Sequence, residues 1–371
     1  MQLNKNYIYL ICGVALFAYL RIGQGKVENV EEVDIASGIG YGIRKEATSN
    51  ANYVIPINSI IYSELGKNTS TIHTGIAITT GKTRANRQLK NDKEFFVGTE
   101  KVYIFEDSIS NFGIKGVVDI LFKNPSVNED GYCTVCIGDV KNYFDYEVEG
   151  YDSPSDYIAG MIKNSSGYNF FGKEYTIRDV YLMIESEGRN LVLPYIELSE
   201  KGFKINGAAL FKKDKLITFL RIEDTRVMNM LRENKSTGIL TIQKSPDQFI
   251  NMSAKVKRKV KCVKEVGKYK FEIDLNINGD IISNKLYKDL PSKVSIKKEF
   301  ENDIEKRTKA ACEDFLQKMK NDYKLDCLEL GRVAVAKYGR GTGVDWNEIV
   351  CNSDIKVNVK VNVDKVGRGV Y

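Results

Sequence analysis

The sequence predicts a mixed α/β (α+β) fold of two to three domains, each a mainly antiparallel or mixed sheet packed with helices. The length of 371 residues exceeds the usual size of one domain. Strand and helix patterns alternate in the first half, whereas the second half holds long strands of period two and one long amphipathic helix. With 43% apolar and 28% charged residues, the composition is globular and excludes the disordered, collagen-like and disulfide-scaffold classes.

The first half of the chain is predicted to form a mixed α/β unit. Short apolar segments predict strands at residues 33–43, 53–61, 72–79, 101–105 and 133–137. Helical periodicity predicts helices at residues 109–122, 155–163 and 176–187, the first of them with Ser108 as its N-cap. Pro194 closes this unit.

Beyond Pro194 strands dominate, followed by the strongest helix signal of the sequence. Strands are predicted at residues 196–198, 203–211, 215–220, 239–242, 254–263, 269–277 and 355–363, with a short helix at 224–232. In the last strand apolar residues alternate with lysines and asparagines, so one face is buried and the other solvated. The long helix is predicted from an apolar stripe that faces a sheet, made of Ile296, Phe300, Ile304, Ala311, Phe315, Met319 and Tyr323.

These patterns place domain boundaries at Pro194 and at Leu290–Pro291. The predicted parts are a signal or anchor segment (1–24), an N-terminal mixed α/β domain (25–193), a middle β-rich domain (194–290) and a C-terminal helix-plus-strand domain (291–371).

The N-terminus has the profile of a signal peptide. Lys5 precedes an apolar run of 14 residues, Tyr7–Leu20, and Arg21 follows it. A helix of that length would span about 21 Å, less than the roughly 30 Å of a hydrocarbon core. Export is therefore favoured over a stable transmembrane span, and a buried core helix is the remaining alternative.

The cysteines and the single histidine limit the chemistry available to the chain. Seven scattered cysteines are an odd number and do not resemble a disulfide framework. Cys133 and Cys136 form a C-x-x-C on a predicted strand, where positions three apart point to opposite faces. Buried thiols are therefore favoured over a metal or redox site. His73 is the only histidine, which excludes sites built from several histidines.

The charge pattern points to no nucleic-acid partner. The net charge of +6 is modest for this length and spread along the chain. One cluster runs along the strand 254–263 and just beyond it, where a cationic face is formed by Lys255, Lys257, Arg258, Lys259, Lys261 and Lys264. We expect a solvated face, with contact to phosphate or anionic lipid headgroups as the alternative.

No catalytic, cofactor-binding or metal-binding residue is predicted. The glycines of Gly38-Ile39-Gly40-Tyr41-Gly42 fit no phosphate-loop pattern and instead predict close packing of strands. The carboxylate pairs Glu31–Glu32 and Glu106–Asp107 lie in surface-like contexts. Asp345 and Trp346 suggest a ligand site, but a lone Trp is more often the anchor of a satellite core.

Several stretches, in shared order and spacing, resemble the Ger(x)C family, the lipoprotein C subunits of GerA-type spore germinant receptors. They cover nearly the full length and lie at residues 30–35, 38–40, 95–107, 113–121, 205–216, 326–331, 345–346 and 355–363. The lipidation cysteine that the family places after the signal peptide is Gln24 here, so a lipid anchor cannot attach at that position. Cys12 lies within the apolar run and is a poor lipidation site.

The resemblance implies a subunit on the outer face of the spore inner membrane that acts with membrane A and B subunits. It also implies mixed α/β domains with no recognised catalytic site and no cofactor. Our leading hypothesis is a non-enzymatic interaction module, suggested by export, exposed sheet edges and the lack of a nucleophile–base pair. The alternative is direct binding of a small-molecule germinant between domains. A hydrolase is the least favoured class.

Overall fold

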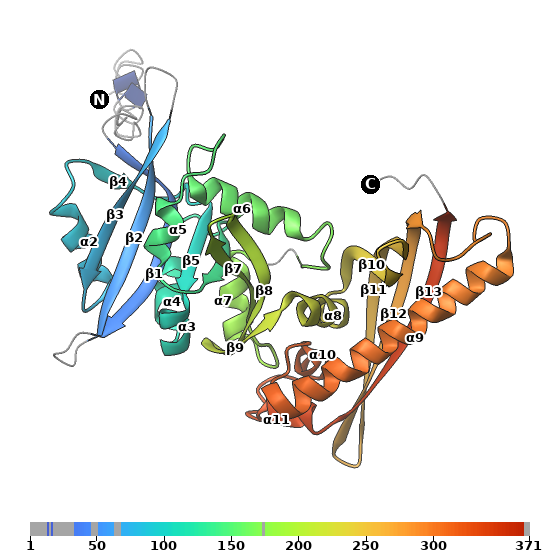
Figure 1. The fold of residues 1–371 in the computed structure, drawn as a ribbon. Helices are drawn as coiled ribbons and strands as arrows, with labels where there is room; N and C mark the ends of the chain where they lie inside the picture. The colour runs from blue at the N-terminus through green and yellow to red at the C-terminus, as the bar shows by residue number, and fades with distance from the viewer. Residues whose placement is uncertain are drawn as a thin grey trace, which may run out of the picture.

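The structure is a computed structural model that describes residues 13–14, 16–17, 33–45, 51–62, 68–172 and 175–366. Within these residues the chain forms a nine-stranded and a four-stranded sheet, which lie side by side with helix α8 (Ile222–Arg232) between them (Figure 1). The mixed α/β fold class predicted from the sequence is confirmed.

The first sheet has the order β3-β2-β1-β5-β6-β7-β8-β9, with β4 also paired to β1. Its centre is parallel, from β1 through β5 and β6 to β7, and its two sides are antiparallel hairpins. The strands are β1 (Val33–Lys45), β2 (Ala51–Ile61), β3 (Thr69–Ala77), β4 (Glu94–Phe96), β5 (Val102–Glu106), β6 (Tyr132–Cys136), β7 (Val192–Ser199), β8 (Gly202–Lys212) and β9 (Lys215–Arg221).

Helices follow the parallel strands and cover the sheet. They are α2 (Thr80–Gln88), α3 (Asp107–Phe112), α4 (Lys115–Lys123), α5 (Val140–Asp145), α6 (Pro154–Ser165) and α7 (Ile177–Glu185). The single helix predicted for residues 109–122 is wrong, because Gly113 adopts a φ of +125° and separates α3 from α4. The predicted close packing of the glycine-rich strand is confirmed at Gly42, where a Cβ would overlap the Glu106 carboxylate.

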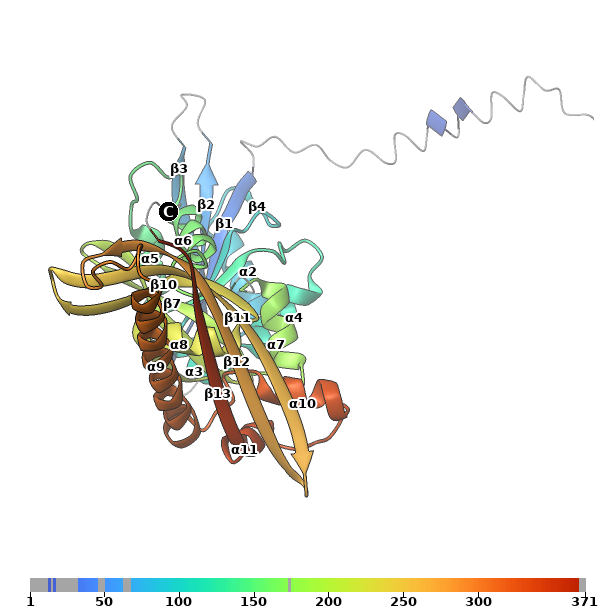
Figure 2. The same ribbon diagram turned by 90° about the vertical axis from the view of Figure 1, so that its right-hand side faces the viewer.

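The second sheet has the order β10-β11-β12-β13. β10 (Lys235–Ser245), β11 (Gln248–Glu265) and β12 (Lys268–Asn284) are antiparallel, and β13 (Asp354–Val366) runs parallel to β12. Figure 2 shows these long strands curving past α8 and α9. The predicted alternation is confirmed in β12 and β13, where Phe271, Ile273 and Val357 are buried while Lys356 and Lys360 are exposed.

The long helix α9 (Val294–Lys318) packs along β13 and continues into the π-helical turn η2 (Met319–Tyr323). Its apolar stripe differs from the prediction in the middle. Ala311 is exposed, and Thr308 and Cys312 face the sheet instead, because they continue the four-residue spacing from Phe300 and Ile304.

The outer edges of both sheets are partly closed by side chains. The Glu305 and Glu301 carboxylates of α9 accept the N–H groups of Val361 and Val363 in β13, each at 2.9 Å. On β3, Asn86 of α2 accepts the N–H of Ile76 at 3.1 Å. Backbone donors that would otherwise pair with another strand are thus satisfied within the chain.

The two sheets are joined through β7, β8 and β9. Along β8, Ala209 and Phe211 face the first hydrophobic core, whereas Ala208 and Leu210 face the second. Pro194 lies inside β7, and α9 packs on β13, which belongs to the same sheet as β10, β11 and β12 before Leu290–Pro291. We propose two modules in place of the predicted three domains: an N-terminal module (33–221) and a C-terminal module (235–366), joined by α8. The last two short helices, α10 (Leu330–Tyr338) and α11 (Trp346–Cys351), belong to the C-terminal module.

Phe170 of the N-terminal module is inserted into the core of the C-terminal module. Its N–H donates to Thr237 O at 2.8 Å, and Ile239 N–H donates to Tyr168 O at 3.2 Å, so the loop extends the edge of β10. The Phe170 side chain is 1% exposed. The Arg226 guanidinium lies 5.7 Å from the ring centroid.

Replacing Phe170 with alanine is expected to lower the free energy of unfolding by about 3–5 kcal/mol, because it opens a cavity in the C-terminal core. Urea denaturation measures this loss. Tyr168→Ala is the matched control: its ring is 59% exposed, so we expect a change within about 0.5 kcal/mol. Equal effects of the two substitutions would contradict the insertion.

Candidate functional site

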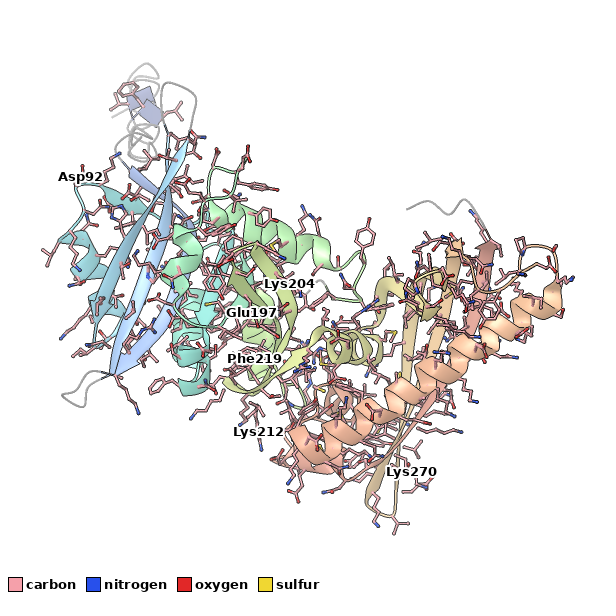
Figure 3. The ribbon with its side chains drawn as sticks, in the orientation of Figure 1. Asp92, Glu197, Lys204, Lys212, Phe219 and Lys270 are labelled. Carbon is pink, nitrogen blue, oxygen red and sulfur yellow. The ribbon has the colours of Figure 1, made fainter. Side chains whose placement is uncertain are left out.

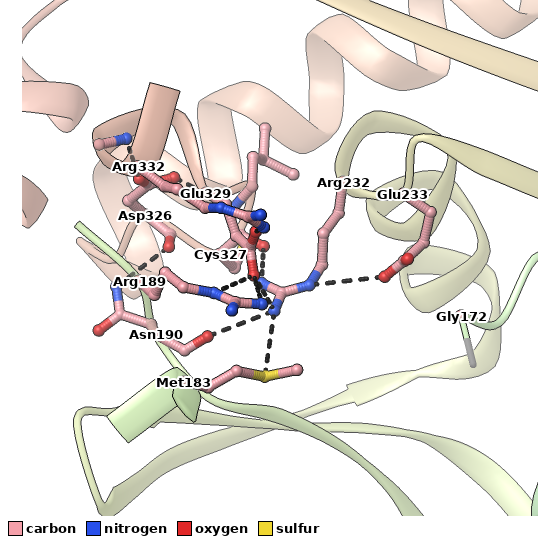
Figure 4. A network of polar contacts seen from close by, with 12 residues as sticks. Gly172, Met183, Arg189, Asn190, Arg232, Glu233, Asp326, Cys327, Glu329 and Arg332 are labelled. Carbon is pink, nitrogen blue, oxygen red and sulfur yellow. Dashed lines mark hydrogen bonds and ion pairs between the residues drawn. The ribbon is translucent and has the colours of Figure 1, made fainter. Parts of the chain in front are cut away.

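An extensive buried polar network lies where the two modules meet, and we call it the junction (Figure 4). At its centre is Glu329, which precedes α10. One carboxylate oxygen accepts from Arg189 of the N-terminal module at 2.7 Å and from Arg232 of α8 at 2.8 Å, and the other accepts from Arg332 at 2.7 Å. The side chains of Glu329 and Arg232 are 9% and 5% exposed. One carboxylate therefore holds three guanidinium groups from three parts of the chain.

Electrostatics keep this carboxylate ionised. Burial opposes the charged form, but the guanidinium groups of Arg232 and Arg189 outweigh it and lower the pKa of Glu329 to about 2. Arg232 donates further to Cys327 O at 2.8 Å and to Asn190 O at 3.4 Å. The buried guanidinium is therefore held by both modules.

The loop that carries Glu329 is shaped by Asp326. Its carboxylate accepts three backbone N–H groups, from Leu328 at 3.1 Å, Leu330 at 3.2 Å and Gly331 at 2.7 Å. Burial raises the pKa of Asp326, and the three backbone donors oppose that rise. The result is a tight loop in which Glu329 adopts a φ of +57°.

Two further contacts tie this loop to the N-terminal module. The Asn190 side chain donates to Asp326 O at 3.0 Å. The backbone of Gly188, with a φ of +71°, lies so close to Gly331 that a Cβ there would overlap the main chain.

Trp346 completes the junction. Its indole N–H donates to Glu187 of the N-terminal module at 3.0 Å, and its ring packs edge-on against Tyr269 at 5.3 Å. Trp346 is buried in the main core of the C-terminal module rather than in the satellite core that was predicted. It connects the two modules.

A cleft of about 660 Å³ borders the junction. It lies between the turn after α7, the β8–β9 hairpin and residues 343–347. Lys212, at the end of β8, points across it toward the C-terminal module and pairs with Asp345 at 3.1 Å (Figure 3). Lys115 pairs with Asp119 at 3.1 Å and with Glu185. Most of the charge at the cleft is thus neutralised within the chain.

The predicted buried thiols are confirmed. Cys133 and Cys136 lie in β6 with their side chains shielded from water, and burial raises the pKa of both. His73 in β3 lies 3.4 Å from the Asp34 carboxylate and packs edge-on against Phe95. Neither feature brings a nucleophile next to a base.

Two sequence-based interpretations are wrong. Glu106 does not lie in a surface-like context: it is fully buried, accepts from Arg44 Nη2 at 2.9 Å and from Val140 N at 3.0 Å, and sits at the end of β5. Arg258 does not belong to the cationic face. It points inward and donates to Leu328 O at 2.8 Å beside the junction, whereas Lys255, Lys257, Lys259 and Lys261 are exposed as predicted.

Several predictions concern residues outside those that the structure describes. These are the signal peptide as a whole, Cys12, Gln24 and the pair Glu31–Glu32. In the described part of the chain, no helix combines the length and the apolar character that a membrane crossing requires.

The junction residues were not predicted as a site. Arg189, Arg232 and Glu329 are far apart in the sequence, and each looks like an ordinary charged residue. The available signal was local: Arg232 ends an apolar helix turn, and Asp326 and Glu329 alternate with Cys327, Leu328 and Leu330. Charged residues inside apolar segments indicate buried ion pairs.

The fold is a mixed α/β fold with two sheets, and a buried polar network links the parts that carry them. Comparison with known proteins identifies the family of the chain. The family model described as "Spore germination protein N-terminal domain" matches residues 26–198, and that described as "Spore germination B3/GerAC like, C-terminal" matches residues 206–367. The chain belongs to the Ger(x)C family of spore germination proteins.

Individual relatives agree with this assignment. The spore germination protein GerQC of Bacillus cereus is 23% identical over an alignment that covers 98% of this chain and 99% of the relative. The spore germination protein A3 of Bacillus subtilis strain 168 is 21% identical and covers 68% of each chain. The crystal structure of the GerBC protein shares the fold, with a TM-score of 0.53 and 16% identity over 91% of this chain and 100% of that one.

Glu329→Gln is expected to lower the free energy of unfolding by about 3–5 kcal/mol, because it leaves buried guanidinium groups without a counterion. Urea denaturation measures the loss. Glu313→Gln is the control: its pair with Lys309, at 3.8 Å on the surface of α9, is expected to contribute about 0.3–0.5 kcal/mol. A Glu329→Gln protein as stable as the control would refute the central role of Glu329.

The contribution of Glu329 is expected to depend on pH. The folded state lowers its pKa from 4.5 to about 2, so the stabilisation is complete above 4.5 and is lost as the pH falls toward 2. The difference in unfolding free energy between wild type and Glu329→Gln, measured from pH 7 to pH 2, should be constant at first and then shrink. A difference that grows on acidification would show that the sign is wrong.

Proposed function

We propose that this chain is a non-enzymatic, extracytoplasmic subunit of a spore nutrient germinant receptor. It assembles with, or couples to, membrane A and B subunits at the outer face of the spore inner membrane. The observation that carries the proposal is that two consecutive family regions, 26–198 and 206–367, are joined by a buried ionic junction. A chain with that construction offers its partners two surfaces at a fixed relative position.

The use of buried charge supports a role without catalysis. Glu106, Asp326 and Glu329 are three buried carboxylates, and each is held by a guanidinium group or by backbone N–H groups. A general acid or base needs a group that is free to exchange a proton with a substrate. These carboxylates are committed to holding the fold.

The exposed side chains of the C-terminal module supply a surface for a partner. On the outer face of β11, Lys255, Lys257 and Lys259 form an exposed row. Lys261 at its end pairs with Glu272 at 3.2 Å and Asp274 at 3.3 Å. Charged rows of this kind steer association toward acidic partners.

A second candidate is direct binding of a small-molecule germinant at the cleft between the modules, whose volume of about 660 Å³ lies in the range of ligand sites. It is the weaker candidate, because Lys212 and Lys115 at the cleft are already paired with carboxylates.

The proposal predicts that the tagged chain, purified from detergent-solubilised spore membranes, carries the A and B subunits of one receptor with it. An unrelated exported protein with the same tag is the control. Removing the chain should also slow the germination that nutrients trigger, because an incomplete receptor couples poorly. Recovery of the chain without either subunit, together with unchanged germination, would refute the proposal.

A further inference from the structure

A second cavity lies within the N-terminal module, on one face of the first sheet and bordered by α2 and α4. Its volume is about 260 Å³. The walls are mostly apolar and include Ile39 and Ile55 from the sheet, Phe95 from β4 and Val117 from α4. A space of this size suits a molecule smaller than a typical drug.

One charged side chain stands in this apolar space. Arg87, near the end of α2, is 6% exposed and lines the cavity. Its Nη1 donates to Ile55 O at 3.3 Å, and its guanidinium lies 4.9 Å from the centroid of the Phe95 ring. Its Nε is buried and has no hydrogen-bond partner. Leaving a buried charged donor unsatisfied is costly, so the arrangement calls for an acceptor.

The described residues around the cavity supply no counterion. Among the residues that line it there is no Asp or Glu, and the one other cation, Arg84, is exposed. Burial lowers the pKa of Arg87 to about 10, so the guanidinium is still charged at neutral pH. An incoming carboxylate would meet a buried positive charge that has no acidic partner among the described lining residues.

The loops beside the cavity are held in place by another buried carboxylate. Glu100 is fully buried and accepts from Gly98 N–H at 3.0 Å, Asn128 N–H at 3.1 Å and the Tyr103 hydroxyl at 3.3 Å. This fixes the segments that contribute Val97 and Val127 to the wall. Tyr41 also lines the cavity, and burial raises its pKa, so its hydroxyl keeps the proton that it can donate.

We propose that this cavity binds a small monocarboxylate with an aliphatic or aromatic body, whose carboxylate pairs with Arg87 and whose body packs between α2, α4 and the sheet. Because no acidic residue is among the described residues that line the cavity, the site distinguishes simple monocarboxylates from zwitterionic amino acids. A zwitterionic amino acid would bring an ammonium group that finds no carboxylate among the lining residues that the structure describes, so the site disfavours it. The proposal is independent of receptor assembly.

The test is isothermal titration calorimetry on the purified full chain with hexanoate, phenylacetate, 1-hexanol and L-norleucine. Hexanoate or phenylacetate is expected to bind saturably. L-Norleucine, which adds an ammonium group to the hexanoate skeleton, should bind about tenfold more weakly or worse. This comparison uses the wild-type protein and does not depend on the folding of a variant.

Arg87→Met keeps the length of the side chain and removes its charge. It should weaken carboxylate binding by about tenfold or more, because a charge-assisted hydrogen bond is lost, and leave 1-hexanol unaffected. Arg178→Met, on the surface of α7, is the matched control and should change nothing. Three outcomes would each overturn the proposal. The first is that hexanoate and phenylacetate both fail to bind at concentrations up to about 10 mM. The others are that L-norleucine binds as tightly as hexanoate, or that Arg87→Met binds the carboxylates as tightly as the wild type.

Discussion

The structure depends most on the ionised carboxylate of Glu329. Three guanidinium groups, from Arg189, Arg232 and Arg332, converge on it from both modules and from α8. Guanidinium groups that lie close together in a buried site repel one another. The free-energy cost of their desolvation is offset only when a counterion and hydrogen-bond acceptors are present. The loop at 326–331 supplies both, since its carbonyl groups accept from Arg232 and Arg258. The relative position of the two sheets follows from how this loop is anchored.

Much of the fold could be predicted because its periodicity is strong. The alternation in β12 and β13 and the apolar stripe of α9 identify the buried face of each element. Where the prediction failed, a tertiary contact overrode the local pattern. Arg258 stands in a row of lysines, yet its guanidinium turns inward to the Leu328 carbonyl. The domain boundary at Pro194 stays a prediction; in the structure Pro194 lies in β7, which pairs with β6 and β8.

The junction could not be predicted from periodicity, because its members come from segments far apart in the sequence: Arg189 precedes Glu329 by 140 residues and Arg232 precedes it by 97. The segment 326–331 was noticed through its family resemblance and Asp345–Trp346 also as a possible ligand site, but no sequence pattern indicated that Glu187, Arg189 and Arg232 meet them. The cavity beside Arg87 could not be predicted from the sequence either. Its helix is short and mostly polar, and the isolation of the guanidinium is visible only once the sheet and α4 enclose it.

The glutamates that cover β13 have a consequence for crowding. Protein chains at high local concentration meet one another often, and unpaired strands at the edge of a sheet can pair with strands of a neighbouring chain. Glu301 and Glu305 occupy donors of β13, and Asn86 occupies one on β3. Copies of this chain at high concentration are therefore hindered from pairing through these strand edges. Specific association with a partner then depends on side-chain contacts.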